Sequence, residues 1–163
     1  MLIFIVSLSL IAAVAMRNVN TGERVVANER DRAIAFQGAE SAGRDAIALV
    51  SAGGGALTAL VPGYYATPIA RGGNAEFWRT TSSMAADSSC TFADTTKRFD
   101  WASCAATSSA NYGNKQAPQY VIEKHPDVVV SATVTEHWYR ITTRAAGGSN
   151  EADVILQIMF TAP

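Results

Sequence analysis

The residues that could do chemistry in this chain are few and scattered. Cys90 and Cys104 are the only cysteines among 163 residues, and His125 and His137 are the only histidines. Two cysteines cannot complete a four-ligand zinc site by themselves, and neither histidine has a Cys, Asp or Glu at a recurring metal-ligand spacing. We therefore expect a disulfide between the cysteines, which would close a short surface loop and imply an oxidising compartment. Two buried free thiols are the alternative.

Other polar residues form no recognisable catalytic or binding motif. Asp87, Asp94 and Asp100 lie in and beside the loop of the cysteines, but without the Asp-x-Asp-x-Asp-Gly register of a calcium loop. The sequence contains no Gly-x-Ser-x-Gly elbow, and Gly53–Gly55 lacks the Lys-Ser/Thr of a phosphate loop. We predict no enzyme activity, no cofactor and no metal.

Composition adds a limit on partners. The formal net charge is -1 at pH 7, so we expect no specific binding of nucleic acid and no general attraction to anionic lipid. Partner choice must then come from shape and apolar surface. The length is typical of one globular domain, even if the first 50 residues form a separate helix.

The chain begins with an uncharged apolar segment from Met1 to Met16, which Arg17 follows. As a helix, about 16 residues span about 24 Å, a little less than the ~30 Å hydrocarbon core of a bilayer. The segment would therefore lie in a membrane only marginally, or pack in a bundle of copies of itself. The side chains predicted to pack in the core of such a filament are Leu2, Ile3, Phe4, Ile5, Val6, Leu8, Leu10, Ile11 and Val14.

A cleaved secretory signal is the plainest alternative for this segment. The alanines between Ala12 and Ala15 could mimic a cleavage site, but the basic residues that should precede the apolar region are absent. The short span also indicates either residues missing upstream or an unusual mature N-terminus.

Residues Glu23 to Val50 show the periodicity of an amphipathic helix. Small residues such as Gly38 and Ala42 would let a sheet or another helix approach closely, although a glycine inside a helix costs about 1 kcal/mol relative to alanine. Ser51 to Gly55 should end the helix. The face predicted to pack on the head consists of Phe36, Ala39, Gly43, Ile47 and Val50.

Between the two helical segments lies a stretch of poor helix formers, Asn18, Asn20, Thr21 and Gly22. The helix should kink or unwind there, or else stay helical because packing holds both flanks. The sequence favours neither alternative.

The remaining chain predicts loops followed by strands. Residues 56–117 show no sustained periodicity, and the aromatic stretches Glu76–Trp78 and Phe99–Trp101 should pin these loops to the head. Three late runs are rich in β-branched residues, and a Gly-Gly turn should join the last two as an antiparallel hairpin. These runs are Gln119–Glu123, Val128–Arg144 and Ala152–Phe160.

Together these segments predict an α+β fold, with one long N-terminal helix packed on a three- to four-stranded antiparallel sheet. The predicted division is an apolar helix over residues 1–22, its amphipathic continuation over 23–55, and a globular head over 56–163.

Three stretches of this sequence resemble the PilX family of type IV pilus minor pilins. They are the apolar run ending in Val14-Ala15-Met16-Arg17, the segment Asn28–Ala42 with its Arg-Asp-Arg and Ala-Phe-Gln-Gly-Ala-Glu, and the C-terminal pair Pro118–Glu123 and Tyr139–Gly148. The resemblance covers both ends of the chain and leaves the loop-rich middle unmatched. Many pilins carry glutamate at the fifth mature position, whereas this sequence has Ile5, so the N-terminal salt bridge of such pilins is not carried over.

This resemblance implies a pilin-like structural subunit of an extracellular filament, inserted in the inner membrane before assembly. Its partners would be copies of itself in a helical filament, other pilins, or both, as either a repeating subunit or a minor subunit near the tip. A bitopic membrane-anchored periplasmic binding protein is the first alternative. A secreted adhesin or hydrolase with a residual signal sequence is the second.

Overall fold

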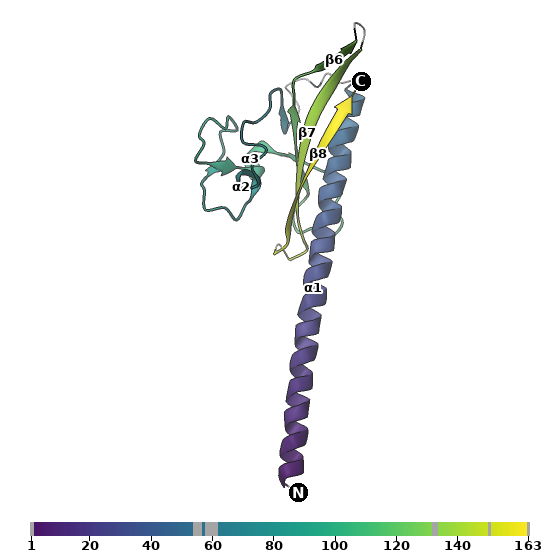
Figure 1. Ribbon diagram of the computed structural model, residues 1–163, viewed down its shortest axis with the longest axis vertical. Helices are drawn as coiled ribbons and strands as arrows, with labels where there is room; N and C mark the ends of the chain where they lie inside the picture. Colours follow the sequence, from purple (N-terminus) through teal and green to yellow (C-terminus); the bar gives the residue numbers. More distant parts are fainter. Residues whose placement is uncertain (1, 54–56, 58–61, 132–133, 150, 163) are drawn as a thin grey trace.

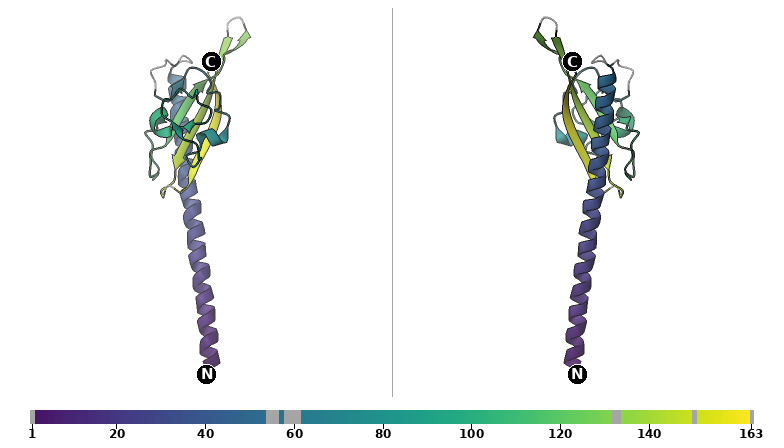
Figure 2. Two further views of the ribbon diagram at one scale, coloured as in Figure 1. Left: turned by 90° about the vertical axis from the view of Figure 1, so that its left-hand side faces the viewer. Right: turned by 90° about the vertical axis from the view of Figure 1, so that its right-hand side faces the viewer.

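The computed structural model describes residues 2–53, 57, 62–131, 134–149 and 151–162. It consists of one long helix, α1 (Leu2–Ala52), and a head that lies along the second half of that helix (Figure 1). The part of α1 before Asp31 extends beyond the head and is called the bare half below, and the part after it is called the covered half. The N-terminus is at the far end of the bare half, so the molecule is strongly elongated (Figure 2).

The head is built on a six-stranded sheet whose centre is β7. β5 and β8 pair antiparallel to β7, one on each side, whereas β1 pairs parallel to β5. The sheet is therefore mixed, not the smaller antiparallel sheet that the sequence predicts, although the α+β class is confirmed. The strands are β1 (Tyr64–Tyr65), β4 (Ala106–Thr107), β5 (Gln119–Lys124), β6 (Val128–Ser131), β7 (Val134–Ala146) and β8 (Asp153–Ala162).

The parallel strand arises from a tight turn that sequence periodicity does not reveal. Gly63 has a φ of +72°, and its carbonyl accepts a hydrogen bond of 2.8 Å from the amide of Ile122. A Cβ at Gly63 would lie 2.6 Å from the amide nitrogen of Ala106, so only glycine lets β1 and β4 approach β5 together.

The predicted strand over Val128–Arg144 is two strands in the structure. β6 pairs antiparallel with β7, with Val128 opposite Glu136, and residues 132–133, which connect the two strands, lie outside the described residues. The sequence there is Ala-Thr, which carries no turn signal. The predicted hairpin of the last two runs is confirmed as β7 with β8, with His137 opposite Ala162 and Ala146 opposite Asp153.

The two faces of the sheet carry different layers. α1 contacts β5, β7 and β8 on one face, where Val50, Tyr139 and Ile141 are fully buried. The loop-rich part of the head covers the other face (Figure 1). That part holds α2 (Ala75–Trp78), β2 (Ala86–Asp87), β3 (Arg98–Phe99) and α3 (Trp101–Cys104).

α1 is helical without interruption through Asn18, Asn20, Thr21 and Gly22. This differs from the kink or unwinding that the sequence offers as one alternative. Each poor helix former costs at most about 1 kcal/mol, and the helix propagates one hydrogen bond per residue from long segments on both sides. The boundary predicted between residues 55 and 56 lies outside the described residues.

Candidate functional site

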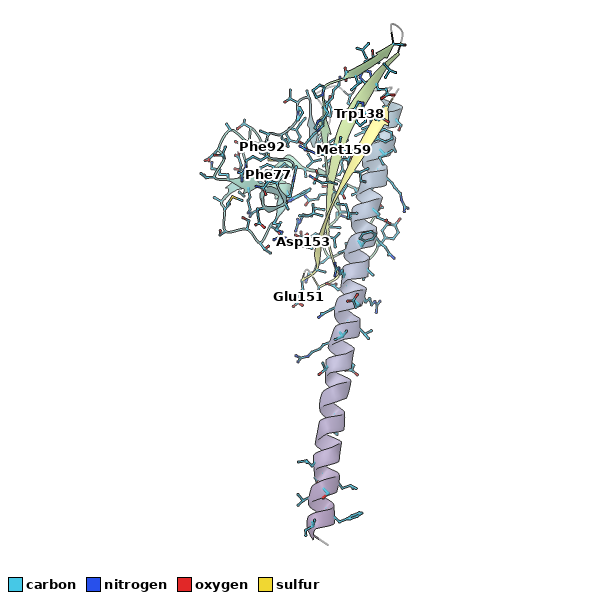
Figure 3. The ribbon with its side chains drawn as sticks, viewed as in Figure 1. Phe77, Phe92, Trp138, Glu151, Asp153 and Met159 are labelled. Carbon is cyan, nitrogen blue, oxygen red and sulfur yellow. A yellow bond between two sulfur atoms is a disulfide. The ribbon has the colours of Figure 1, made fainter. Side chains whose placement is uncertain are left out.

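The bare half of α1 presents large apolar side chains that no other described part of the chain covers. Ile3 is 83% exposed and Phe4 76%, and the N-terminal part of α1 extends beyond the head (Figure 3). Burying such side chains is favourable by about 1.5–3 kcal/mol each. Of the side chains predicted to pack in a filament core, Ile3, Phe4, Ile5, Val6, Leu8 and Leu10 are all exposed, and those of Leu2, Ile11 and Val14 lie outside the described residues.

The half of α1 under the sheet buries a stripe of small residues. Ala35, Ala39, Ala42, Ala46 and Val50 recur at steps of three and four residues and are all 0% exposed. Because their side chains are short, the helix axis can come close to the sheet.

Among the side chains predicted to pack on the head, Ala39, Gly43 and Val50 are buried and Ile47 is half-buried. Phe36 differs, because this residue is 45% exposed. It follows Ala35 by one residue and so points about 100° away from the stripe. A ring on the stripe itself would hold the helix away from the sheet.

Two glycines show how tight this contact is. A Cβ at Gly38 would lie 2.6 Å from Asn114 Nδ2 and 2.9 Å from the Cβ of Ala145, and a Cβ at Gly43 would lie 2.8 Å from Ile158. Real Cβ atoms do not approach other atoms so closely. The cost of glycine inside a helix is therefore offset by packing at both positions.

Polar contacts fasten α1 to the head at the edge from which the bare half of the helix extends. The Asp31 carboxylate accepts hydrogen bonds from the amide of Ser149 (2.9 Å), from its hydroxyl (2.7 Å) and from the amide of Ala152 (3.2 Å). These bonds, led by the Ser149 hydroxyl, hold the pKa of Asp31 below its usual value. Asp31 thus ties the turn between β7 and β8 to the helix.

A second fastening comes from the loop before β5. Asn114 Nδ2 donates to the carbonyls of Ile34 (3.1 Å) and Ala146 (2.7 Å), so one amide joins α1 to β7. Ser108 Oγ donates to Asp45 of α1 at 2.6 Å. Nothing in the sequence indicates that Asp31 and Asp45 have partners 118 and 63 residues away.

On the other face of the sheet, aromatic side chains form a separate core. Phe77, Trp78, Phe99 and Trp101 are at most 2% exposed, and Phe92 stacks on Phe99 with ring centroids 5.3 Å apart. The indoles are also hydrogen-bonded, because Trp78 Nε1 donates to Gly72 and Trp101 Nε1 to Trp78. Figure 3 shows Phe77 and Phe92 in this part, away from α1. The aromatic stretches therefore form a core of their own, besides holding the loops.

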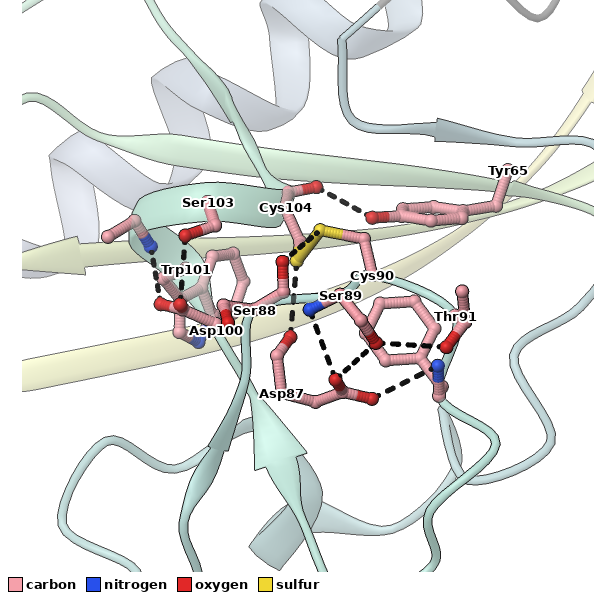
Figure 4. The surroundings of a disulfide bond; sticks show 12 residues. Tyr65, Asp87, Ser88, Ser89, Cys90, Thr91, Asp100, Trp101, Ser103 and Cys104 are labelled. Atoms are coloured by element: carbon pink, nitrogen blue, oxygen red, sulfur yellow. Dashed lines mark hydrogen bonds between the residues drawn. A yellow bond between two sulfur atoms is a disulfide. The ribbon is translucent and has the colours of Figure 1, made fainter.

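The disulfide lies at the edge of this aromatic core. Cys90 and Cys104 are bonded, with their Cα atoms 5.5 Å apart (Figure 4). The hydroxyl of Tyr65 donates to the carbonyl of Cys104 at 2.8 Å, and the Asp87 carboxylate accepts from the amides of Ser89 and Phe92. The disulfide therefore closes a loop on the side of the head opposite α1.

A buried ion pair joins the loop-rich part to the sheet. Glu123 is 0% exposed and accepts from Arg140 at 2.7 and 2.9 Å, and this pairing raises the pKa of Arg140. Glu123 also accepts from the amide of Ile69 at 2.8 Å. Because each charge is paired and hydrogen-bonded, the pair fixes the 69–72 loop on the sheet.

The histidines take no part in a cluster of ligands. His137 Nδ1 lies 2.9 Å from Asp127 Oδ1, which holds the pKa of that carboxyl below its usual value. His125 donates its backbone amide to Trp138. Among the described residues, no group of three or more His, Cys, Asp or Glu side chains could hold a metal ion. In the same residues, no helical segment combines the length and the apolar character that a membrane span requires.

Comparison with known proteins identifies one family. The model of that family, described as the C-terminal part of the type IV pilus assembly protein PilX, matches residues 79–162, which include α3, β5, β7 and most of the aromatic core. No curated protein and no solved structure matches the chain. The matched residues lie in the head and exclude α1.

Proposed function

The chain belongs to the PilX family of type IV pilus assembly proteins, and on this premise we propose that it is a structural subunit of an extracellular pilus-like filament, assembled through its N-terminal helix. The family is one of pilus assembly components and not of enzymes. Before assembly, the subunit would be held in the inner membrane. Its partners would be copies of itself, other pilins, or both.

The observation that carries this proposal is the exposed apolar half of α1. Ile3, Phe4 and Leu8 are 83%, 76% and 64% exposed, and the chain carries no charged side chain before Arg17. Helices that leave lipid for a bundle of other helices exchange one apolar environment for another, so close packing must hold them together. A helix whose segment before Arg17 is uncharged, and whose head is fixed at the other end, can do this while the head stays in water.

The test is to make this half of the helix polar without touching the head. The double variant Phe4→Ser/Leu8→Ser should be lost from sheared filaments by about tenfold or more, because two apolar contacts are replaced by poorly satisfied hydroxyls. The head should keep its thermal midpoint. Met159→Ser is the matched control, because Met159 is 54% exposed but lies on β8, and it should be incorporated normally.

Normal incorporation of the Phe4/Leu8 variant would contradict the proposal. A wild-type chain that stays in the membrane and never enters a filament would instead favour a bitopic periplasmic binding protein. Quantitative mass spectrometry of sheared filaments then separates the two forms of the proposal, because a repeating subunit should dominate the filament and a minor or tip subunit should be rare.

A further inference from the structure

β8 is an edge strand of the sheet, because it pairs with β7 on one side and with no other strand among the described residues. The amide of Gly147 donates to the carbonyl of Ala152 at 2.8 Å, and this bond sets the alternation of the ladder. In an antiparallel ladder, the backbone groups of successive residues point alternately toward the partner strand and away from it. The amides and carbonyls of Ile155 and Gln157 therefore point away from β7, and within the described chain they have no hydrogen-bond partner.

This edge lacks the features by which proteins usually keep a further strand from adding to a sheet. Such features are charged side chains and prolines on the edge strand, bulges, and a covering helix or loop. From Val154 to Ala162, β8 contains no charged residue and no proline. It also stays in register with β7 over its whole length. A second strand could therefore pair with β8 without any change in β8 itself.

Two grooves flank the start of β8. One lies between β8 and α1 and has a volume of about 670 Å³, and the other lies between β8 and α2 and has a volume of about 630 Å³. We call them the α1 groove and the α2 groove. Glu151, Asp153 and Ile155 line both, and Figure 3 shows Glu151 and Asp153 at the end of the head from which the bare half of α1 extends. Because successive side chains of a strand point to opposite faces of a sheet, a strand added to β8 would place its side chains in the two grooves in turn.

The two grooves differ in charge. Carboxylates predominate in the α1 groove, whose charged residues are Glu29, Asp31, Arg32, Glu151 and Asp153. Of these carboxylates, Glu29 and Glu151 form no ion pair within the described chain. In the α2 groove, Ala75 and Ile155 supply apolar surface, and Arg79 is already paired with a neighbouring carboxylate at 2.8 Å. The α1 groove thus favours a basic side chain, and the α2 groove a small apolar one.

We propose that the edge of β8 binds an extended segment of another protein, with lysine or arginine side chains in the α1 groove and small apolar side chains in the α2 groove. The segment adds to the sheet as a further strand. Hydrogen bonds to the backbone of Ile155 and Gln157 hold it, and Glu29 and Glu151 select its basic side chains. The grooves follow residues 151–157, so about seven residues of the partner, or about 23 Å of strand, fit beside β8. This binding is separate from assembly through the N-terminal helix.

The experiment titrates the full chain in detergent with the peptide acetyl-Val-Lys-Val-Lys-Val-Lys-Val-amide and follows hydrogen exchange at single amides by NMR. At saturation, the amides of Ile155 and Gln157 should exchange about tenfold more slowly or less, because each gains a hydrogen bond. The amides of Val154 and Leu156 should keep their rates, because they already bond to β7. The same peptide with glutamate in place of lysine is the control and should give no protection.

Proline variants test the edge itself. Gln157→Pro removes an outward amide and should weaken binding of the lysine peptide about tenfold, while the pairing with β7 persists because edge strands tolerate proline where the amide faces away from the sheet. Gln157→Ala loses only the side-chain hydrogen bonds to Gly72 and Thr142 and should bind within about twofold of the wild type. Met159→Pro is the matched control, because its amide also points outward but lies beyond both grooves. It should likewise keep the affinity.

Charge variants test the choice of a basic segment. Glu151→Gln should lower the affinity for the lysine peptide about fivefold, and Glu136→Gln, at the far end of β7, should leave it unchanged. The proposal is overturned if β8 gains no protection, if adjacent β8 amides are protected alike, or if protection appears on β6 instead. Equal binding of the glutamate peptide or unaltered binding by Gln157→Pro would also overturn it. The filament function is tested separately, because incorporation of Phe4→Ser/Leu8→Ser does not depend on any of these results.

Discussion

Below the head, α1 exposes its side chains, and beneath the sheet the same helix buries them. Both halves contain glycine and alanine among larger apolar residues. Under the sheet, Gly38 and Gly43 each have an atom within 3 Å of the absent Cβ, whereas among the described residues, its chain neighbours and nearby helix backbone aside, no atom lies within 4 Å of that place at Gly22 in the bare half. The comparison teaches that Gly38 and Gly43 in the covered half serve the fold of this chain, whereas Gly22 in the bare half makes room for no other described part of the chain.

The strongest way to break this comparison is to place the same large side chain in both halves. Gly38→Leu should reduce the free energy of unfolding by about 3 kcal/mol or more, because it displaces Asn114 and overpacks the contact with Ala145. Gly22→Leu should leave that free energy unchanged or raise it by up to about 1 kcal/mol, because leucine is the better helix former at an open position. Urea unfolding of the full chain in detergent, followed by tryptophan fluorescence of the head, measures both.

The three tryptophans make that measurement specific to the head, since Trp78, Trp101 and Trp138 all lie outside α1. Equal losses of stability in the two variants would mean that Gly22 also serves the fold, and the comparison would fail. If Gly38→Leu does not fold at all while Gly22→Leu folds, the result supports the comparison even more strongly than the expected loss of stability.

A smaller effect distinguishes two apolar residues within the covered half. Val50→Ala should reduce the free energy of unfolding by about 2 kcal/mol, because Val50 is fully buried against Ile141 and its neighbours. Phe36→Ala removes more atoms but should cost about 0.5 kcal/mol or less, because the ring is 45% exposed. The same urea titration measures both, and a larger loss for Phe36→Ala would show that the ring packs on the head.

The sequence predicts those elements of the fold in which a pattern of apolar residues repeats over many positions. The apolar start, the amphipathic continuation to Val50 and the β7–β8 hairpin all show in residue patterns, because each buries one face over many residues. Strands of two residues, such as β1 and β4, are too short to show the alternation of apolar and polar residues by which a strand is recognised. The division of the predicted Val128–Arg144 strand into β6 and β7 was missed because β-branched residues continue on both sides of it.

The candidate site was predictable only in outline. The spacing of apolar residues identifies the helix face near Ala39. The same spacing wrongly includes Phe36 in this face, because spacing does not distinguish a short side chain that fits against the sheet from a long one that does not. Asn114 gives no signal at all, since its partners Ile34 and Ala146 are 80 and 32 residues away. Such contacts depend on the tertiary fold and not on local pattern.

The smallest expected effect concerns Asp31, at the border between the bare and covered halves. Its pKa is lowered in the folded chain, chiefly by the Ser149 hydroxyl, so its contribution to stability is full above the unfolded pKa of about 4 and is lost as pH falls through the lower folded value. Hydrogen exchange at the amides of Ser149 and Ala152 should therefore become faster relative to other head amides as pH falls from 5 toward 2. Asp31→Asn should show fast exchange at both pH values.

Asp94→Asn is the matched control for this titration. Asp94 has a lowered pKa of the same origin, from the hydroxyl and amide of Thr96, but it lies in the loop-rich part on the other face of the sheet. Loss of the Asp94 carboxylate should make hydrogen exchange faster near Thr96 and leave the exchange rate of the Ser149 amide as in the wild type. If both variants affect the β7–β8 turn alike, acid acts on the head as a whole, and Asp31 is not the contact that separates the covered half of α1 from the bare one.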